Sequence, residues 1–157
     1  MRKHHSRRTV LRTTAGLAAA TTGLAAFAGS AAAHWEKELD IDVKPGNERN
    51  PINPRSRGVT TVAVLHNEAF DPTRADVRYR FGASDVVGDG GGARPVRHCV
   101  EDVDGDGHDD LVLVFRTAEA GFDHDDEVAE LRWDRTEDRL HGLSGQDEIR
   151  TVGRGRR

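Results

Sequence analysis

The stretch from Glu101 to Phe115 constrains the fold and chemistry of this chain more than any other. It reads Glu-Asp-Val-Asp-Gly-Asp-Gly-His-Asp-Asp, followed by the apolar run Leu-Val-Leu-Val-Phe. Aspartates stand at alternate positions, a glycine follows the third of them, and the chain continues with strand-forming residues. Calcium binds hard oxygen donors, and short loops can supply these from alternate side chains. We therefore predict a calcium loop that leads into a core β-strand.

The spacing starts like an EF-hand loop and then departs from it. Counted from Asp102, position 12 should be a bidentate Glu, but Leu113 stands there. An EF-hand also needs a flanking helix, whereas Leu111 to Phe115 is strand-like. We predict instead a loop between two strands, in which aspartate side chains and one backbone carbonyl hold Ca²⁺. The predicted ligands are Asp102, Asp104, Asp106, Asp110 and the carbonyl of His108.

The rest of the chain predicts an all-β fold. Leu39–Lys44 alternates apolar and polar residues, as a half-buried strand does, and Val59–Leu65 is a β-branched run typical of a central strand. Gly, Pro and Asn turns separate the segments, and no amphipathic helix is evident. We predict an immunoglobulin-like antiparallel β-sandwich of about seven strands over residues 34–153.

The alternation in one further segment predicts which of its side chains face the core. In the segment 75–82, Val77, Tyr79 and Phe81 are expected to face the core, which turns Arg78 and Arg80 towards water.

The N-terminus has the pattern of an export signal. A basic segment is followed by a weakly apolar run that ends in Ala31-Ala32-Ala33, a small-residue cleavage pattern. Ser6-Arg7-Arg8-Thr9-Val10-Leu11 is similar to a twin-arginine signal. We predict a cleaved signal peptide over residues 1–33, an extracellular or cell-surface location with no membrane association after cleavage, and a basic tail over residues 154–157.

Net charge and cysteine content indicate which partners this chain can bind and how its fold can be stabilised. The five basic residues of 1–33 leave 18 of the 23 Lys and Arg residues against all 27 acids, a formal net charge of −9. An acidic, lysine-poor chain fits a halophilic source and disfavours nucleic acid, because phosphates would be repelled. Cys99 is the only cysteine, so no intramolecular disulfide can form and a bound metal would be a natural staple.

Several short sequence motifs occur along residues 39–153 in an order that is similar to that of a known protein family. They are Ile-Asp-Val-Lys-Pro-Gly at 41–46, Ile-Asn-Pro at 52–54, Val-Ala-Val-Leu at 62–65, the aspartate loop at 101–111, and Ile-Arg-Thr-Val-Gly at 149–153. This order resembles a widespread exported prokaryotic β-domain that is often appended to larger extracellular proteins and has no assigned activity. The resemblance implies a compact calcium-binding β-domain and transfers no catalytic residues.

Other metal sites fit less well. Acidic residues 123 and 125–127 are candidates for a second cation site, but a solvated acidic loop is the favoured interpretation. Four residues are of types that bind zinc: His98, Cys99, His124 and His141. Their spacing matches no known Cys/His zinc motif. If cleavage follows Ala33, the alternative is a copper site formed by the amine and imidazole of His34 with His66 or His141.

The sequence favours a binding module over an enzyme. Gly142-Leu143-Ser144-Gly145 falls short of a nucleophile motif, and no nucleophile–base pair is evident. We predict no enzymatic activity, a monomer, and an unidentified protein or glycan partner. A sugar-stacking surface formed by Trp35 and Trp133 is an alternative, but Trp133 lies in an alternating segment that favours the core. A metal-dependent extracellular enzyme is the alternative.

Overall fold

The structure, a computed structural model, describes residues 34–137 and 141–153. The chain divides into Met1–Ser30 and Ala31–Arg157, and all described residues belong to the second unit. The predicted signal peptide and basic tail lie outside the described residues.

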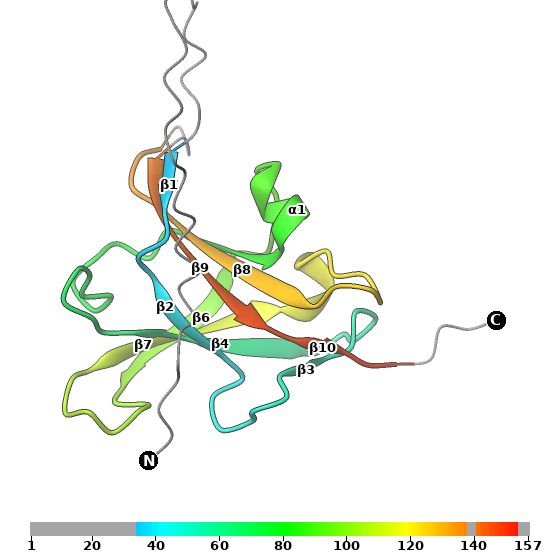
Figure 1. The fold of residues 1–157 in the computed structure, drawn as a ribbon, viewed down its shortest axis with the longest axis horizontal. Helices are drawn as coiled ribbons and strands as arrows, with labels where there is room; N and C mark the ends of the chain where they lie inside the picture. The colour runs from blue at the N-terminus through cyan, green and yellow to red at the C-terminus, as the bar shows by residue number, and fades with distance from the viewer. Residues whose placement is uncertain (1–33, 138–140, 154–157) are drawn as a thin grey trace, which may run out of the picture. The chain divides into compact units, whose positions relative to one another are not determined.

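The described residues form two four-stranded sheets and a small two-stranded pairing (Figure 1). The first sheet has the order β1 (His34–Glu36), β9 (His141–Glu148), β8 (Val128–Asp134), β5 (Tyr79–Ala83). The second has the order β2 (Asp40–Val43), β4 (Val59–Leu65), β7 (Asp110–Arg116), β6 (Pro95–Glu101). The small pairing joins β3 (Pro51–Ile52) and β10 (Arg150–Thr151).

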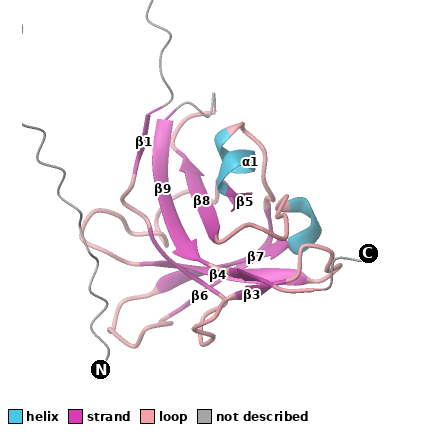
Figure 2. Ribbon diagram, turned by 45° about the vertical axis from the view of Figure 1, so that its right-hand side comes forward, coloured by secondary structure: helices cyan, strands magenta, loops and turns pink. Residues whose placement is uncertain are grey.

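Most pairings are antiparallel, and the exceptions are β1 with β9 and β3 with β10. Helical structure is limited, within the described residues, to α1 (Ser84–Gly88) and the 3₁₀ turn η1 (Thr117–Glu119). Neither is long or apolar enough to cross a membrane. Figure 2 shows the small helical share and the strands of the first sheet running steeply across those of the second.

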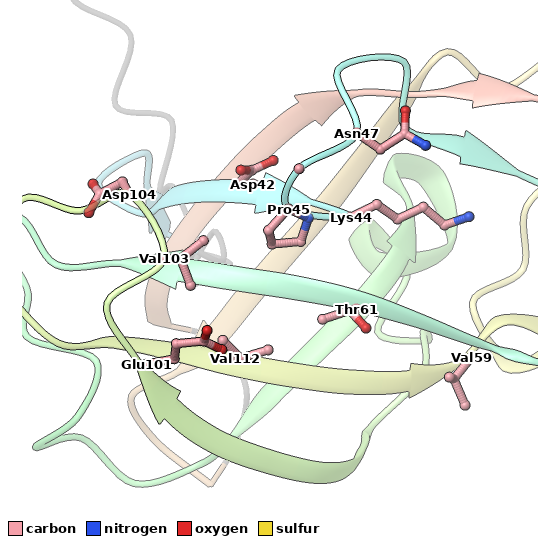
Figure 3. Close-up of a pocket in the computed structure, with 11 residues that line it drawn as sticks. Asp42, Lys44, Pro45, Asn47, Val59, Thr61, Glu101, Val103, Asp104 and Val112 are labelled. Carbon is pink, nitrogen blue, oxygen red and sulfur yellow. The ribbon is translucent and has the colours of Figure 1, made fainter.

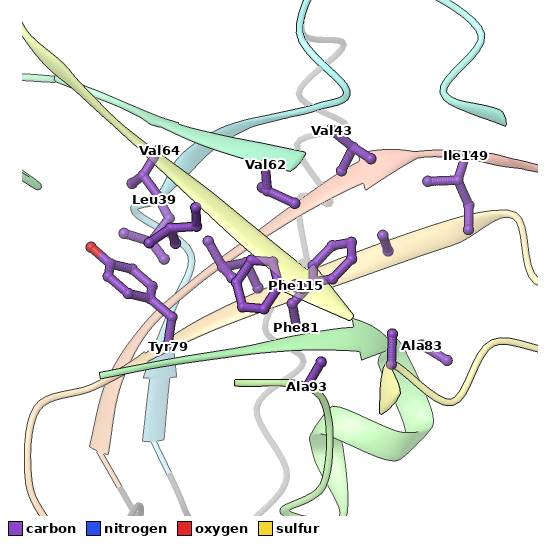
Figure 4. Packing of buried hydrophobic residues seen from close by; sticks show 14 of the residues in the cluster. Leu39, Val43, Val62, Val64, Tyr79, Phe81, Ala83, Ala93, Phe115 and Ile149 are labelled. Carbon is purple, nitrogen blue, oxygen red and sulfur yellow. The ribbon is translucent and has the colours of Figure 1, made fainter. Parts of the chain in front are cut away.

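The core fills the space between the two sheets. Leu113 and Phe115 on β7 are fully buried, and the Phe115 ring lies 5.0 Å from the ring of Phe81 on β5 (Figure 4). Ile52 is fully buried and anchors the Pro-rich connection to this core. The predicted all-β sandwich is therefore confirmed.

The strand count exceeds the prediction of about seven. Ten strands are present in the described part of the chain, and β1, β3 and β10 contain only three, two and two residues. Pairings this short carry too few residues for an alternation pattern to reveal them.

The orientation predicted for Arg80 is wrong. Arg80 is only 2% exposed, and its Nη2 lies 2.9 Å from Oδ1 of Asp134 on β8. Its Nη1 donates to the carbonyl of Val87 in α1, and the ring of Trp35 lies 5.6 Å from its guanidinium carbon. Strand β5 is thus covered on both faces, because α1 and Trp35 pack over the side that alternation assigns to water. Val77 precedes β5 and is 38% exposed, so it lies outside the predicted core.

Candidate metal centre

Four aspartates of the β6–β7 connection converge on one point. Each offers a carboxylate oxygen, and these oxygens all lie within 4.8 Å of one another. Three of the side chains are exposed and belong to the loop, whereas the fourth is buried and begins β7. The group consists of Asp102, Asp104, Asp106 and Asp110. It can hold a metal ion.

Asp110 fixes the loop to the sheet. Its side chain is fully buried, Oδ1 accepts a hydrogen bond from the amide of His66 at 2.8 Å, and Oδ2 accepts one from the amide of Val103 at 2.9 Å. His66 directly follows β4, which pairs with β7. One carboxylate therefore joins the end of β4, the start of β7 and the entry of the loop.

Asp102 folds the loop back on itself. Its Oδ1 accepts a hydrogen bond from the amide of Gly105 at 2.9 Å and its Oδ2 accepts one from Gly107 at 3.0 Å. Gly105 and Gly107 have φ of +71° and +88°, a region that favours glycine. The two glycines thus let the chain curl so that alternate side chains meet.

The two central aspartates have different proton affinities. Loss of hydration, together with the negative charges of Asp110 and Asp106, raises the pKa of Asp104. The amide of His108 donates to Oδ1 of Asp106 at 2.8 Å, and this hydrogen bond lowers the pKa of Asp106. The carboxylate crowding that contributes to the raised pKa of Asp104 is an arrangement that a cation would relieve.

Two histidine rings stack at the loop, one from the loop itself and one from the end of β4. The ring of His108 stacks on the ring of His66, with centroids 4.5 Å apart and planes 12° from parallel. The predicted carbonyl ligand at His108 stays a prediction, as do the ligand roles of the four aspartates. Sequence reasoning missed the part that His66 plays, because no local pattern links it to Asp110, which lies 44 positions further along the chain.

The other acidic residues and the zinc candidates form no comparable group among the described residues. No second group of three or more potential ligands occurs within residues 34–137 and 141–153. Two sets of candidates are therefore not gathered into such a site among these residues. They are the acidic residues 123 and 125–127 and the zinc candidates His98, Cys99, His124 and His141. Glu101 and Asp109 are exposed and stand outside the aspartate group.

The tryptophans are engaged within the fold. Trp133 is half-buried, packs against Phe70 with ring centroids 5.1 Å apart, and donates through Nε1 to the carbonyl of Asp76. The guanidinium of Arg132 lies 4.7 Å from the ring of Trp35.

Comparisons with protein-family models, with curated proteins and with solved structures found no match. Fold and site together define the class of protein: an all-β sandwich with an aspartate cluster that can hold a metal ion.

Proposed function

We propose that this chain is an exported, calcium-binding β-domain that acts as an extracellular or cell-surface interaction module, without enzymatic activity. The observation that carries the proposal is the convergence of four carboxylates within 4.8 Å at the entry of β7. The ion stabilises the domain by holding the loop against the sheet.

The donor set favours calcium over softer metals. The group contains only carboxylates, and hard oxygen donors suit Ca²⁺ or Mg²⁺ rather than Zn²⁺ or copper. Calcium tolerates irregular geometry, whereas Mg²⁺ demands an octahedron, so a strongly curved loop favours calcium. A carboxylate oxygen that accepts an amide hydrogen bond keeps a second lone pair for the ion. The carbonyl of His108 and water complete the coordination.

A groove beside the loop supports the interaction role. It has a volume of about 600 Å³ on the outer face of the second sheet, between the turn after β2 and the start of the aspartate loop (Figure 3). Its lining mixes apolar and charged side chains, and six of these are Asp42, Lys44, Pro45, Val103, Asp104 and Val112. Because Asp104 belongs to both groove and cluster, an ion would order one wall of the groove.

Calcium titration by calorimetry tests the site. Chelator-treated protein is expected to bind one Ca²⁺ more tightly than Mg²⁺, and Asp106→Ala is expected to abolish the heat. Asp125→Ala, which removes an exposed acid outside the cluster, is the matched control and should bind as the wild type does. No calcium binding by the wild type would end the proposal.

The interaction role needs its own test. The calcium-loaded protein would be applied to a glycan array and a peptide array, and assayed against a panel of extracellular hydrolase substrates. Binding that Val112→Asp in the groove abolishes supports the module. Turnover that depends on the metal would favour the enzyme instead.

A second candidate is a copper site at a mature N-terminus that begins with His34. One observation favours it: His34 and His141 are backbone partners in the parallel pairing of β1 with β9. Copper would be titrated into a chain that starts at His34, and into a control carrying one extra N-terminal alanine. Tight binding that the extra alanine and His141→Ala both remove would support this candidate, and absence of stoichiometric binding would exclude it.

A further inference from the structure

Strand β6 is an open edge of the second sheet. It is the last strand in the order β2-β4-β7-β6 and pairs, among the described residues, only with β7. Figure 3 shows it below β7, with no strand beyond it in that view. The side chains from Val96 to Glu101 are all exposed, and Val96 and Val100 are about half exposed. An open edge with exposed valines is a template for pairing with another strand.

The usable part of this edge is short and well defined. Register shifts between Pro95 and Arg97, and Pro95 has no amide hydrogen to donate, so both features blunt one end of the strand. At the other end the aspartate loop begins after Glu101. The regular segment is therefore 97–101, and its central residue is Cys99.

This segment is complementary to itself in charge. If two copies pair antiparallel with full overlap of 97–101, Cys99 meets Cys99 of the second copy. Arg97 then lies opposite Glu101 of the second copy, and the two-fold axis repeats the pair. Val100 lies opposite His98 of the second copy in the same way. Opposite charges directly across an antiparallel pair stabilise it, and like charges destabilise it.

We propose that β6 pairs edge to edge with β6 of a second copy of this chain, antiparallel about a two-fold axis through Cys99. The second sheet of each copy then continues into that of the other as one eight-stranded sheet. The arrangement is isologous, so it closes at two copies rather than growing into a fibre. It replaces the monomer predicted from the sequence, and it does not depend on calcium binding.

The size of the contact sets how the dimer must be detected. Five paired residues on each side bury less than the roughly 1,000 Å² typical of a stable interface, so the dimer is expected to be transient. A disulfide between the two Cys99 residues can trap the dimer covalently. Directly opposed residues of an antiparallel pair have Cα atoms about 4.5 or 5.5 Å apart, and both fall within the roughly 4.4–6.8 Å range of disulfides.

The test is to trap the full chain with oxidised glutathione. Two Cys99 thiols form one disulfide, and their two electrons and two protons convert oxidised glutathione into two molecules of the reduced form. The rate of covalent dimer formation would be measured on non-reducing gels, with peptide mapping to locate the cross-link.

Charge variants distinguish pairing from random collision of exposed thiols. Arg97→Glu places like charges opposite each other twice and is expected to slow dimer formation about tenfold. The double variant Arg97→Glu with Glu101→Arg restores opposite charges and is expected to recover most of the rate. Arg94→Glu makes the same change of net charge at an exposed position outside β6 and should trap at the wild-type rate.

A second measurement does not involve the thiol. In Cys99→Ser, amide hydrogen exchange in 97–101 is expected to slow as protein concentration rises. The proposal is overturned by no cross-link at Cys99, by equal rates in all variants, by no recovery in the double variant, or by exchange that is independent of concentration.

Discussion

The buried carboxylate of Asp110 accepts a hydrogen bond from the amide of His66 at 2.8 Å, so a residue of the aspartate cluster also holds the end of β4. Its other oxygen accepts the amide of Val103 at 2.9 Å. Asp106, in contrast, is exposed, and its carboxylate accepts a hydrogen bond from the amide of His108 within the loop itself. Substituting Asp110 therefore tests how far hydrogen bonds of the protein itself stabilise the fold, and substituting Asp106 tests how far a bound ion does.

We expect Asp110→Ala to lower the free energy of unfolding by about 2 kcal/mol even in chelator, because it leaves two partly buried backbone donors without acceptors. Asp106→Ala should change it by less than about 0.5 kcal/mol in chelator, since the site is exposed. Urea unfolding in chelator and in calcium checks both. Equal losses for the two variants in chelator would refute the structural role of Asp110.

The ion pair of Arg80 and Asp134 should be costly to break. Both side chains are at most 5% exposed, so Asp134→Ala leaves a buried guanidinium without its carboxylate. We expect the free energy of unfolding to fall by about 3–5 kcal/mol. Arg78 and Asp76 form an exposed pair at 3.1 Å on the same part of the chain, and Asp76→Ala should cost at most about 1 kcal/mol. Similar losses for the two variants in thermal and urea unfolding would contradict the burial of Arg80.

Tyr79 offers a stabilising substitution. Its side chain is fully buried, its hydroxyl has no hydrogen-bond partner among the residues that the structure describes, and burial strongly raises its pKa. Tyr79→Phe removes a buried polar group while keeping the ring, so we expect a gain of about 1 kcal/mol in the free energy of unfolding. A loss measured by urea unfolding would show that the hydroxyl makes a favourable contact.

Asp147 predicts a pH dependence of stability. Loss of hydration raises its pKa above 3.8, although the amide of Val43 and the side chain of Asn50 donate to it. The folded state therefore binds the proton more tightly than the unfolded state. The resulting stabilisation is complete below pH 3.8 and is lost as the pH rises through the raised pKa.

Asp147→Asn does not titrate, so it isolates this effect. The advantage of the wild type over the variant should be largest below pH 3.8 and should shrink with rising pH. Urea unfolding of both proteins in chelator, from acid to neutral pH, measures the difference. An advantage that grows with rising pH would mean that the sign of the pKa shift is wrong.

Local patterns predict much of this structure. The β-branched run of β4 and the apolar run of β7 mark the two central strands of the second sheet, because such segments need burial on at least one face. The alternate aspartates and the glycines lie within one loop, so their spacing predicts that the carboxylates converge. Two features depend on contacts between distant residues and leave no local pattern: Asp110 with His66, and Arg80 beneath Trp35 and beside Asp134.

The central claim is that the aspartate cluster binds calcium and thereby stabilises the fold. The most direct test is a thermal melt of the chelator-treated protein at high salt, with and without added Ca²⁺. At a calcium concentration about 100 times the Kd, binding adds roughly 2.7 kcal/mol, which should raise the Tm by several degrees. Asp106→Ala should melt at the same temperature in both solutions. A wild-type Tm that calcium leaves unchanged would contradict the account.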